Sequence, residues 1–144
     1  MDNMRFVLDT DVVVAALRSP QGASAELLRL ARREDIILLA NVALALEYEA
    51  TCSRAEHGVA AGLSTAEVQV FLDAVIAMVE PVPSHFLWRP MLRDPSDEMV
   101  LEAAVNGGAS AIVTFNRRDF GWVPSQQFGI EVMVPRDALK RIRQ

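Results

Sequence analysis

Residues 5–11 have the sequence RFVLDTD, a short apolar run, Arg5 to Leu8, that stops at an aspartate. An uninterrupted apolar run of this length, ended by a polar residue, is typical of a buried strand. Three more such runs follow along the chain, at residues 36–40, 111–114 and 130–134. Because continuous rather than alternating apolar strands are typical of parallel sheets covered on both faces, we predict the α/β class. We expect a central, mostly parallel sheet of four to five strands with helices on both sides.

Segments with helical spacing separate these runs. Polar residues that could cap them precede several of the helices: Asp11, Asn41, Ser64 and Ser96. The spacing predicts helices over 12–17, from Ser24 onward, over 42–54, 64–78 and 96–105, and from about residue 136. We expect loops at 55–63 and 116–122, and a proline-punctuated connection at 81–95.

Length and composition indicate one domain, residues 1–144, with a well-filled core. The 144 residues are 51% hydrophobic, and the mean hydropathy is +0.20. No run approaches the roughly 20 apolar residues that cross a bilayer, and the N-terminus does not resemble a signal peptide. A single cysteine, Cys52, excludes an internal disulfide and a cysteine-rich zinc site. We therefore expect a cytoplasmic protein with no membrane contact.

The charge balance is acidic. Fourteen Lys and Arg against 19 Asp and Glu give a net charge of −5, and the isoelectric point is about 5.0. A protein that binds nucleic acid through its overall field is usually basic, so this class is excluded. Acids concentrated in a metal site would lower the net charge without excluding a nucleic-acid substrate.

Polar and acidic residues follow the predicted strands. The residues beside the strand ends are Asp9, Thr10 and Asp11, then Asn41 and Glu47, then Asp94 and Asp97, then Thr114, Asn116 and Asp119. Ligands of open parallel sheets bind beyond the carboxyl ends of the strands. Carboxylates that converge there repel one another and need a cation, and oxygen ligands suit Mg²⁺ or Mn²⁺. Such an ion with open positions is equipped for phosphodiester hydrolysis.

Most of these acids also have an ordinary structural explanation. Asp11 could cap a helix, and Glu47 could face solvent. Asp97 could stabilise the first turn of its helix through a favourable interaction with the helix dipole. Asp119 could stabilise a turn, and Asp94 precedes Pro95, a common turn arrangement. Asp9, directly after four strand residues, is the hardest to explain in this way.

Four segments together resemble PIN-domain ribonucleases, in particular the VapC-like toxins of type II toxin–antitoxin pairs. The segments are FVLDTDVVVAALRSP (6–20), LLANVALALEYEATCSR (38–54), RDPSDEMVLEAA (93–104) and AIVTFNRRDF (111–120). The resemblance implies a PIN-like domain that binds Mg²⁺ or Mn²⁺ and cleaves RNA as an endonuclease. It assigns the catalytic and metal-binding roles to Asp9, Glu47, Asp97 and Asp119, with Thr10, Thr114 and Asn116 in support. It also implies a homodimer and a small antitoxin that covers the acidic cleft, often with an inserted arginine.

The chain departs from the family pattern at three positions. Asp11 stands where Asn or Ser is usual, Glu98 where a second Asp is frequent, and Asn41 where Ser is more usual. None of these changes removes one of the four acids, so we expect a competent site in which the roles of Asp11 and Asp94 stay open.

Several side chains near the acids have two interpretations. The three arginines that flank the expected cleft could bind phosphates or form a solvated basic face: Arg93, Arg117 and Arg118. His57 and His85 are expected to take no part, because metal-assisted hydrolysis needs no histidine.

Two other functions compete with the nuclease. Residues 6–14 also match the DxD signature of haloacid-dehalogenase-like phosphatases, with Asp9 as nucleophile and Asp11 as acid/base. Such enzymes need a lysine before their final acidic pair, and the single lysine, Lys140, follows every candidate acid. A non-catalytic PIN-like interaction protein is the other alternative, and the intact set of four acids argues against it.

Overall fold

A five-stranded, wholly parallel sheet forms the centre of the protein. The computed structural model describes residues 3–83 and 91–144. The strands are β1 (Arg5–Leu8), β2 (Ile37–Ala40), β3 (Val79–Pro81), β4 (Ala111–Val113) and β5 (Glu131–Met133). Their order is β3-β2-β1-β4-β5, and all four neighbouring pairs are parallel. The predicted α/β class and the four predicted strands are confirmed, and the sheet is entirely rather than mostly parallel.

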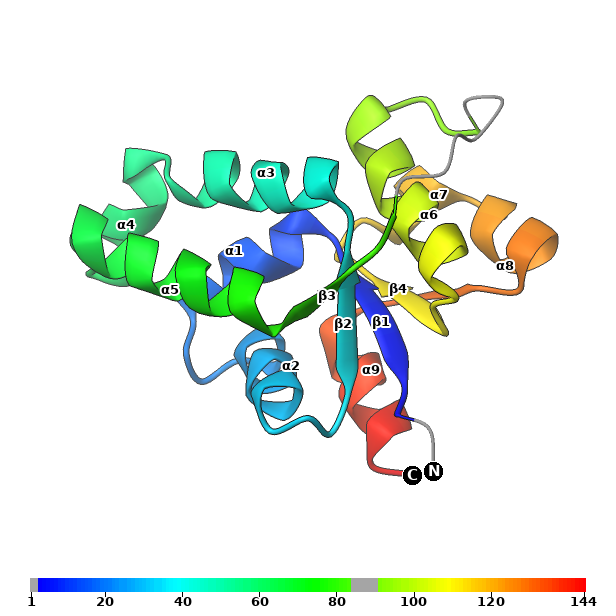
Figure 1. The fold of residues 1–144 in the computed structure, drawn as a ribbon, viewed down its shortest axis with the longest axis horizontal. Helices are drawn as coiled ribbons and strands as arrows, with labels where there is room; N and C mark the ends of the chain where they lie inside the picture. Colours follow the sequence, from blue (N-terminus) through cyan, green and yellow to red (C-terminus); the bar gives the residue numbers. More distant parts are fainter. Residues whose placement is uncertain (1–2, 84–90) are drawn as a thin grey trace.

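Nine helices surround the sheet in the part of the chain that is described (Figure 1): α1 (Thr10–Arg18), α2 (Ala23–Arg32), α3 (Val42–Cys52), α4 (Ala55–Ala61), α5 (Thr65–Met78), α6 (Pro95–Gly107), α7 (Arg117–Phe120), α8 (Val123–Phe128) and α9 (Pro135–Ile142). The chain passes from β1 through β2 to β3 at one edge of the sheet, and crossovers of the usual hand put α1 to α5 on one face. The chain then reverses direction across the sheet, which puts α6 to α8 on the other face. Sheets of this kind bind ligands where the strand order reverses, here beyond the carboxyl ends of β1 and β4.

Strand β3 is the one strand of the five that the sequence did not locate. It is three residues long, its Glu80 and Pro81 are exposed, and it pairs only with β2, at the edge of the sheet. A proline is tolerated on an edge strand because its missing N–H faces no partner. The apolar run that usually reveals a buried strand is therefore absent, and residues 79–81 resemble the end of a helix followed by a connection.

Several predicted boundaries are wrong. Asp9, not Asp11, is the N-cap of α1, and Asp94, not Ser96, caps α6. In both places two polar residues lie close together, and the spacing alone does not say which one begins the helix. Residues 55–63 are not a loop but contain α4, which ends at Gly62 with a φ of 71°.

The expected loop at 116–122 contains the single turn of α7, and α8 follows it without having been predicted. Both are too short for periodicity to reveal them. The predicted caps Asn41 and Ser64 are confirmed. The Asn41 Oδ1 accepts a hydrogen bond from the N–H of Leu44, and Ser64 forms a reciprocal capping box with Glu67.

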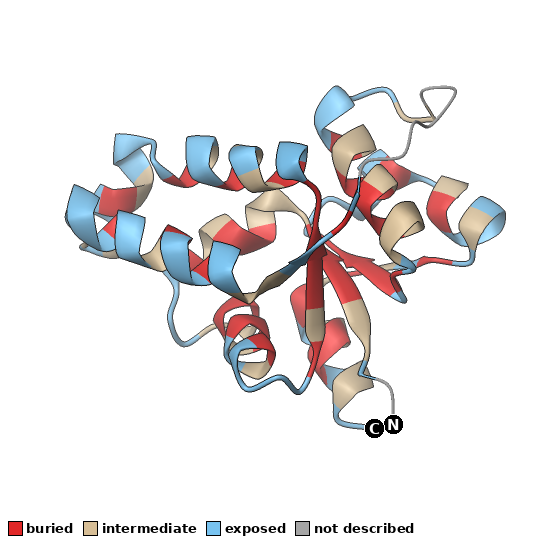
Figure 2. Ribbon diagram, in the orientation of Figure 1, coloured by how far each residue is buried: buried red, intermediate tan, exposed pale blue. Residues whose placement is uncertain are grey.

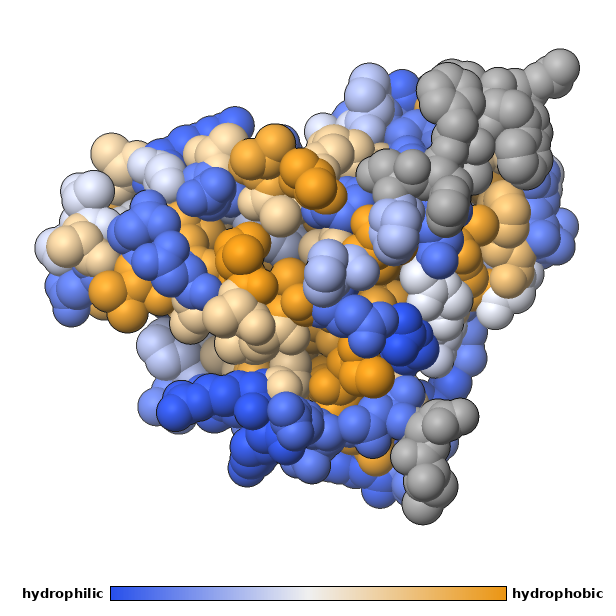
Figure 3. Space-filling model, viewed as in Figure 1, coloured by the Kyte–Doolittle hydropathy of each residue, from blue (hydrophilic) through white to orange (hydrophobic). Residues whose placement is uncertain are grey.

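The core lies on both faces of the sheet (Figure 2). All of β4 is buried, as is β1 after Arg5. Helix α3 is less buried than its composition suggests, since Val42 and Leu46 are 71% and 58% exposed. Figure 3 shows that the face over α3 and α5 carries hydrophobic patches between hydrophilic ones.

No single described helix is long and apolar enough to span a membrane. Helices α4 and α5 meet this criterion only as a pair, and the pair is bent by 95°. His85 and the connection residues Phe86, Leu87 and Trp88 lie outside the described residues.

Candidate functional site

Asp9 lies at the carboxyl end of β1, against the end of β4. Its backbone N–H donates to the Val113 carbonyl over 2.9 Å, which continues the parallel ladder. Its Oδ1 accepts from the Thr10 N–H at 2.8 Å, and its Oδ2 accepts from the Thr114 hydroxyl at 2.8 Å. Thr114 is completely buried. Two residues expected to support the site, Thr10 and Thr114, thus fix both oxygens of the Asp9 carboxylate.

Asp11 ties the loop after β4 to the first turn of α1. Its Oδ2 accepts from the Phe115 N–H at 3.0 Å and from the Asn116 Nδ2 at 3.3 Å, with the Thr114 hydroxyl at 3.4 Å. The Asn116 N–H in turn donates to the Thr114 hydroxyl oxygen at 3.0 Å. The Asp11 Oδ1 is buried and has no hydrogen-bond partner among the described residues. The role that the sequence left open is therefore a tether, not a helix cap.

Three carboxylates in this region have raised pKa values because they are buried and close to other acids. Burial raises the pKa of Asp9, and the charges of Asp119 and Asp94 add to this, against the opposing hydrogen bonds. Burial and the charge of Asp9 raise the pKa of Asp11 to about 6. Burial raises the pKa of Asp97 to about 6 as well, with contributions from Asp9, Asp94, Asp119 and Asp11.

The other three aspartates of this region line one hollow. It has a volume of about 380 Å³ and lies between the start of α6 and α7, with walls that include Asp94, Asp97 and Asp119. The Asp94 Oδ1 accepts from the Ser96 N–H at 2.8 Å and caps α6. Asp97 is buried in the first turn of α6, whereas Asp119 is exposed on α7. The structure therefore brings Asp9, Asp97 and Asp119 within electrostatic reach of one another, and Asp94 and Asp11 with them.

Glu47 is the predicted site residue that stands apart. It is half-buried on α3, and its Oε1 accepts from the Thr51 hydroxyl one turn further along the helix, at 3.3 Å. Ala43 and Ala50, which share its face of the helix, are exposed. The charges that raise the pKa of Asp9 and Asp97 all belong to aspartates. As the side chains stand, Glu47 is not part of the aspartate cluster.

The chemistry of the donors suits a divalent cation, but the described side chains do not form a ready-made metal site. Among residues 3–83 and 91–144, no three His, Cys, Asp or Glu side chains are close enough to hold an ion together. Their mutual repulsion nevertheless disfavours the charged state, and a bound cation would relieve it. Asp9 and Asp97 are the carboxylates best placed to hold such an ion. Both are largely buried, and each is repelled by the negative charges of other aspartates.

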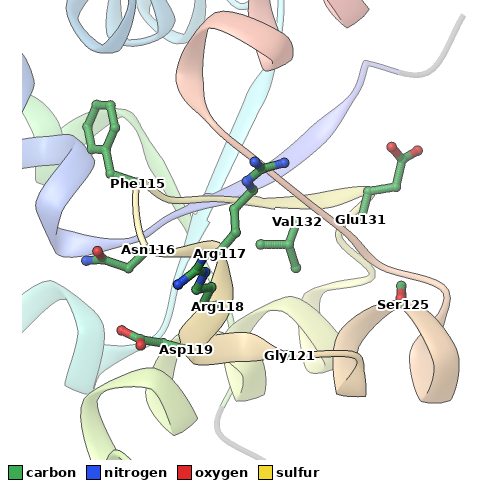
Figure 4. A pocket seen from close by; sticks show the side chains of 9 residues that line it. All are labelled: Phe115, Asn116, Arg117, Arg118, Asp119, Gly121, Ser125, Glu131 and Val132. Carbon is green, nitrogen blue, oxygen red and sulfur yellow. The ribbon is translucent and has the colours of Figure 1, made fainter.

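Arginines surround this acidic region. Arg117 and Arg118 are exposed on α7 and line a basin of about 770 Å³ together with Phe115, Asn116 and Asp119. Figure 4 shows side chains from α7 projecting beside this basin, with Phe115 at one end and Ser125 near the other. Arg118 also lines the hollow of Asp97, as does the exposed Arg93. None of the three arginines forms an ion pair with any described residue.

Three contacts that support the site were not predicted. The hydroxyl of Tyr48, which is completely buried on α3, donates to the Leu8 carbonyl directly before Asp9. Asn41 donates from Nδ2 to the Met99 carbonyl at 3.1 Å and so joins α3 to α6. The Glu98 carboxylate accepts the N–H groups of Met91 and Leu92. A lone tyrosine in an apolar helix was the one available signal, because the other two contacts depend on chain segments that only folding brings together.

Comparisons with known proteins agree with this architecture. The family model described as PIN domain matches residues 5–118. Among solved structures, the chain is similar to that described as VapBC2 from Rickettsia felis bound to a DNA fragment from their promoter, with a TM-score of 0.62. The match covers 90% of this chain and 97% of that chain at 15% identity, which shows a shared fold. Among curated proteins, none matches.

The matched segment contains β1, the tether of Asp11 and the aspartates at the start of α6, and it ends within α7 one residue before Asp119. A parallel sheet with aspartates gathered near the carboxyl ends of β1 and β4, together with a family match over residues 5–118, identifies this chain as a member of the PIN domain family.

Proposed function

We propose that this protein is a metal-dependent endoribonuclease and the toxin of a toxin–antitoxin pair. The observation that carries the proposal is the group of aspartates at the carboxyl end of the sheet. Asp94, Asp97 and Asp119 line one hollow, and burial together with mutual repulsion raises the pKa values of Asp9 and Asp97. A structure that keeps repelling charges together is expected to be stabilised by a cation. Membership of the PIN domain family supports the nuclease chemistry.

Asp9 and Asp97 would hold Mg²⁺ or Mn²⁺, and Asp119 would hold a second ion or orient the attacking water. When bound, the ion neutralises charge on the scissile phosphate and lowers the pKa of coordinated water. The chain's own residues prepare this arrangement. The Thr10 N–H and the Thr114 hydroxyl hold the two Asp9 oxygens, so the carboxylate is oriented before any ligand arrives.

Glu47 would join the site only after its side chain leaves the Thr51 hydroxyl. We propose it as a supporting metal ligand, in keeping with the family pattern. Glu47→Gln is then expected to weaken Mn²⁺ binding less than Asp97→Asn does, because the Glu47 carboxylate has to give up a hydrogen bond first.

RNA is proposed as the substrate, with Arg93, Arg117 and Arg118 as phosphate contacts. All three are exposed beside the aspartates, and none is neutralised by an ion pair with a described residue. Arginine presents a planar fork of donors that matches a phosphate. These positive charges would counter the repulsion between an acidic protein and a polyanion.

A small antitoxin and a second copy of the chain are the proposed partners. The antitoxin is supported by the similarity to the VapBC2 structure, which by its description contains a complex bound to promoter DNA. An acidic crevice suits a basic segment of such a partner. The homodimer is supported by the exposed apolar residues of α3 to α5, among them Leu46, Val59 and Val70. Size-exclusion chromatography with light scattering tests the dimer.

The test of the nuclease compares Asp9→Asn and Asp97→Asn with the wild type in an RNA cleavage assay with added Mn²⁺. Each variant should lose about 100-fold or more of the activity. Asp73→Asn, an exposed aspartate on α5, is the matched control and should cleave normally. Undiminished cleavage by both site variants would remove the mechanism. Tight Mn²⁺ binding by a wild type that cleaves no RNA would favour the non-catalytic interaction protein instead.

A further inference from the structure

Exposed aromatic side chains occur at only one place in the described part of the chain. Phe115 and Trp122 are 51% and 57% exposed. The other exposed large hydrophobic side chains are all aliphatic and lie on α3, α4 and α5: Val42, Leu46, Val59, Val70 and Ile76. The remaining described aromatic residues are buried or half-buried: Phe6, Tyr48, Phe71, Phe120 and Phe128. Both exposed aromatic rings therefore flank α7, beside the aspartates and arginines.

The two residues line two hollows that share part of one wall. Phe115 lines the basin of about 770 Å³, and Trp122 lines the hollow of about 380 Å³ that contains Asp97. Arg118, Asp119 and Gly121 line both. Helix α7 thus forms a ridge, with one aromatic residue on each side and a cation and a carboxylate on the ridge itself.

The backbone holds both rings in place. The Phe115 N–H donates to Asp11 at 3.0 Å, which anchors this residue to α1. Gly121 has φ 56° and ψ −139°, a conformation that favours glycine. This turn ends α7 and directs the chain to Trp122. Single exposed apolar side chains are common on protein surfaces. These two are distinctive because they are the exposed aromatic residues of the described chain and both line hollows that Arg118 also lines.

We propose that Phe115 and Trp122 are stacking platforms for two unpaired bases of single-stranded RNA that lie on either side of the ridge. The backbone phosphate between these bases faces Arg118, which lines both hollows. Stacking on aromatic side chains requires bases that are free of neighbours, since the bases of an A-form duplex are covered by one another. The inference rests on the proposed nuclease function and adds to it two residues that would hold the bases of its substrate.

The test measures binding of a non-cleavable, 2′-modified single-stranded oligonucleotide to the metal-free protein. The Trp88→Phe background leaves Trp122 as the single tryptophan, and its fluorescence should be quenched when the oligonucleotide binds. Phe115→Ala, and Trp122→Ala followed by anisotropy, should each raise the Kd about 5- to 100-fold. Phe115→Tyr and Trp122→Phe should restore most of the affinity. Gln21→Ala, an exposed residue between α1 and α2, is the control and should leave the Kd unchanged.

In cleavage assays the two alanine variants should raise KM for single-stranded RNA and leave kcat within a few-fold. Unchanged Kd values, an equal loss with duplex RNA, or an equal loss in Gln21→Ala would overturn the stacking proposal. Its failure is distinguishable from failure of the nuclease, because binding is measured without metal or turnover. If the wild type binds the oligonucleotide with quenching but cleaves no RNA, the result counts against the nuclease and supports the stacking platforms. If the wild type cleaves RNA but Phe115→Ala and Trp122→Ala leave the Kd unaltered, the result counts against the platforms alone.

Discussion

Replacement of Asp97 by asparagine should stabilise the metal-free protein near neutral pH. Asp97 is 8% exposed. The negative charges that act on it belong to four other aspartates: Asp9, Asp94, Asp119 and Asp11. Asparagine keeps the size and polarity of the side chain and removes its charge. The variant therefore relieves the repulsion that a bound cation would otherwise relieve.

The magnitude follows from the raised pKa of Asp97, about 6 against an ordinary 3.8. A rise of this size corresponds to at most about 3 kcal/mol of unfavourable free energy in the folded, ionised protein. Solvent in the open hollow screens part of this, which leaves about 1–2 kcal/mol. For a chain of this length we expect the melting temperature to rise by about 3–8 °C.

The pH dependence has a definite sign. Because the folded pKa of Asp97 lies above the unfolded one, the ionised carboxylate destabilises the wild type above about pH 6. This penalty fades as the pH falls toward the unfolded pKa of about 3.9. The advantage of Asp97→Asn should therefore be largest at pH 7.5 and small at pH 4.5.

Urea unfolding in the presence of EDTA, followed by fluorescence at both pH values, measures this difference. Asp73→Asn is the control and should match the wild type at each pH. Saturating Mn²⁺ at pH 7.5 should reverse the order, since a ligand at 100 times its Kd stabilises the wild type by about 2.7 kcal/mol. The reasoning would be refuted if Asp97→Asn were less stable than the wild type at pH 7.5 without metal. It would also be refuted if the difference in free energy of unfolding were the same at both pH values.

Three further predictions concern the residues that support the site. Asp11→Ala should lower the free energy of unfolding by about 1–2 kcal/mol in urea melts, because the loop after β4 loses its acceptor, and Asp11→Asn should cost less. Tyr48→Phe should cost about 1–3 kcal/mol, since it leaves the buried Leu8 carbonyl without its donor. Its matched control is Phe71→Leu on α5, away from that carbonyl, and an equal effect of the two would argue against the hydrogen bond. Gly107→Ala should lower the melting temperature in thermal scans, because the new methyl would lie 2.9 Å from two core side chains. A variant as stable as the wild type would show that those side chains can shift.

The sequence predicted the sheet because its inner strands are buried on both faces. Residues 6–8 and 111–113 are continuous apolar runs, and this is the pattern that two covering layers of helices impose. Edge strand β3 was missed for the same reason, since an exposed glutamate and a proline replace the apolar pattern there.

The acids at the strand ends were also predictable, because their place along the chain fixes which edge of a parallel sheet they reach. Asp9, Asp97 and Asp119 do come within electrostatic reach. The sequence could not separate Glu47 from them. The direction of a side chain on a helix depends on which face of that helix is covered, and α3 is less covered than its apolar composition suggested.

What the sequence by itself determined is therefore the class of the fold and the order in which its acids arrive at one edge, because both follow from local spacing along a parallel sheet. The tertiary structure alone decided that Asp11 ties down the loop after β4 and that Tyr48 holds the end of β1. It also decided that the exposed aromatic rings flank α7. These are contacts between residues far apart in the chain, or differences in solvent exposure, and neither leaves a periodic trace in the sequence.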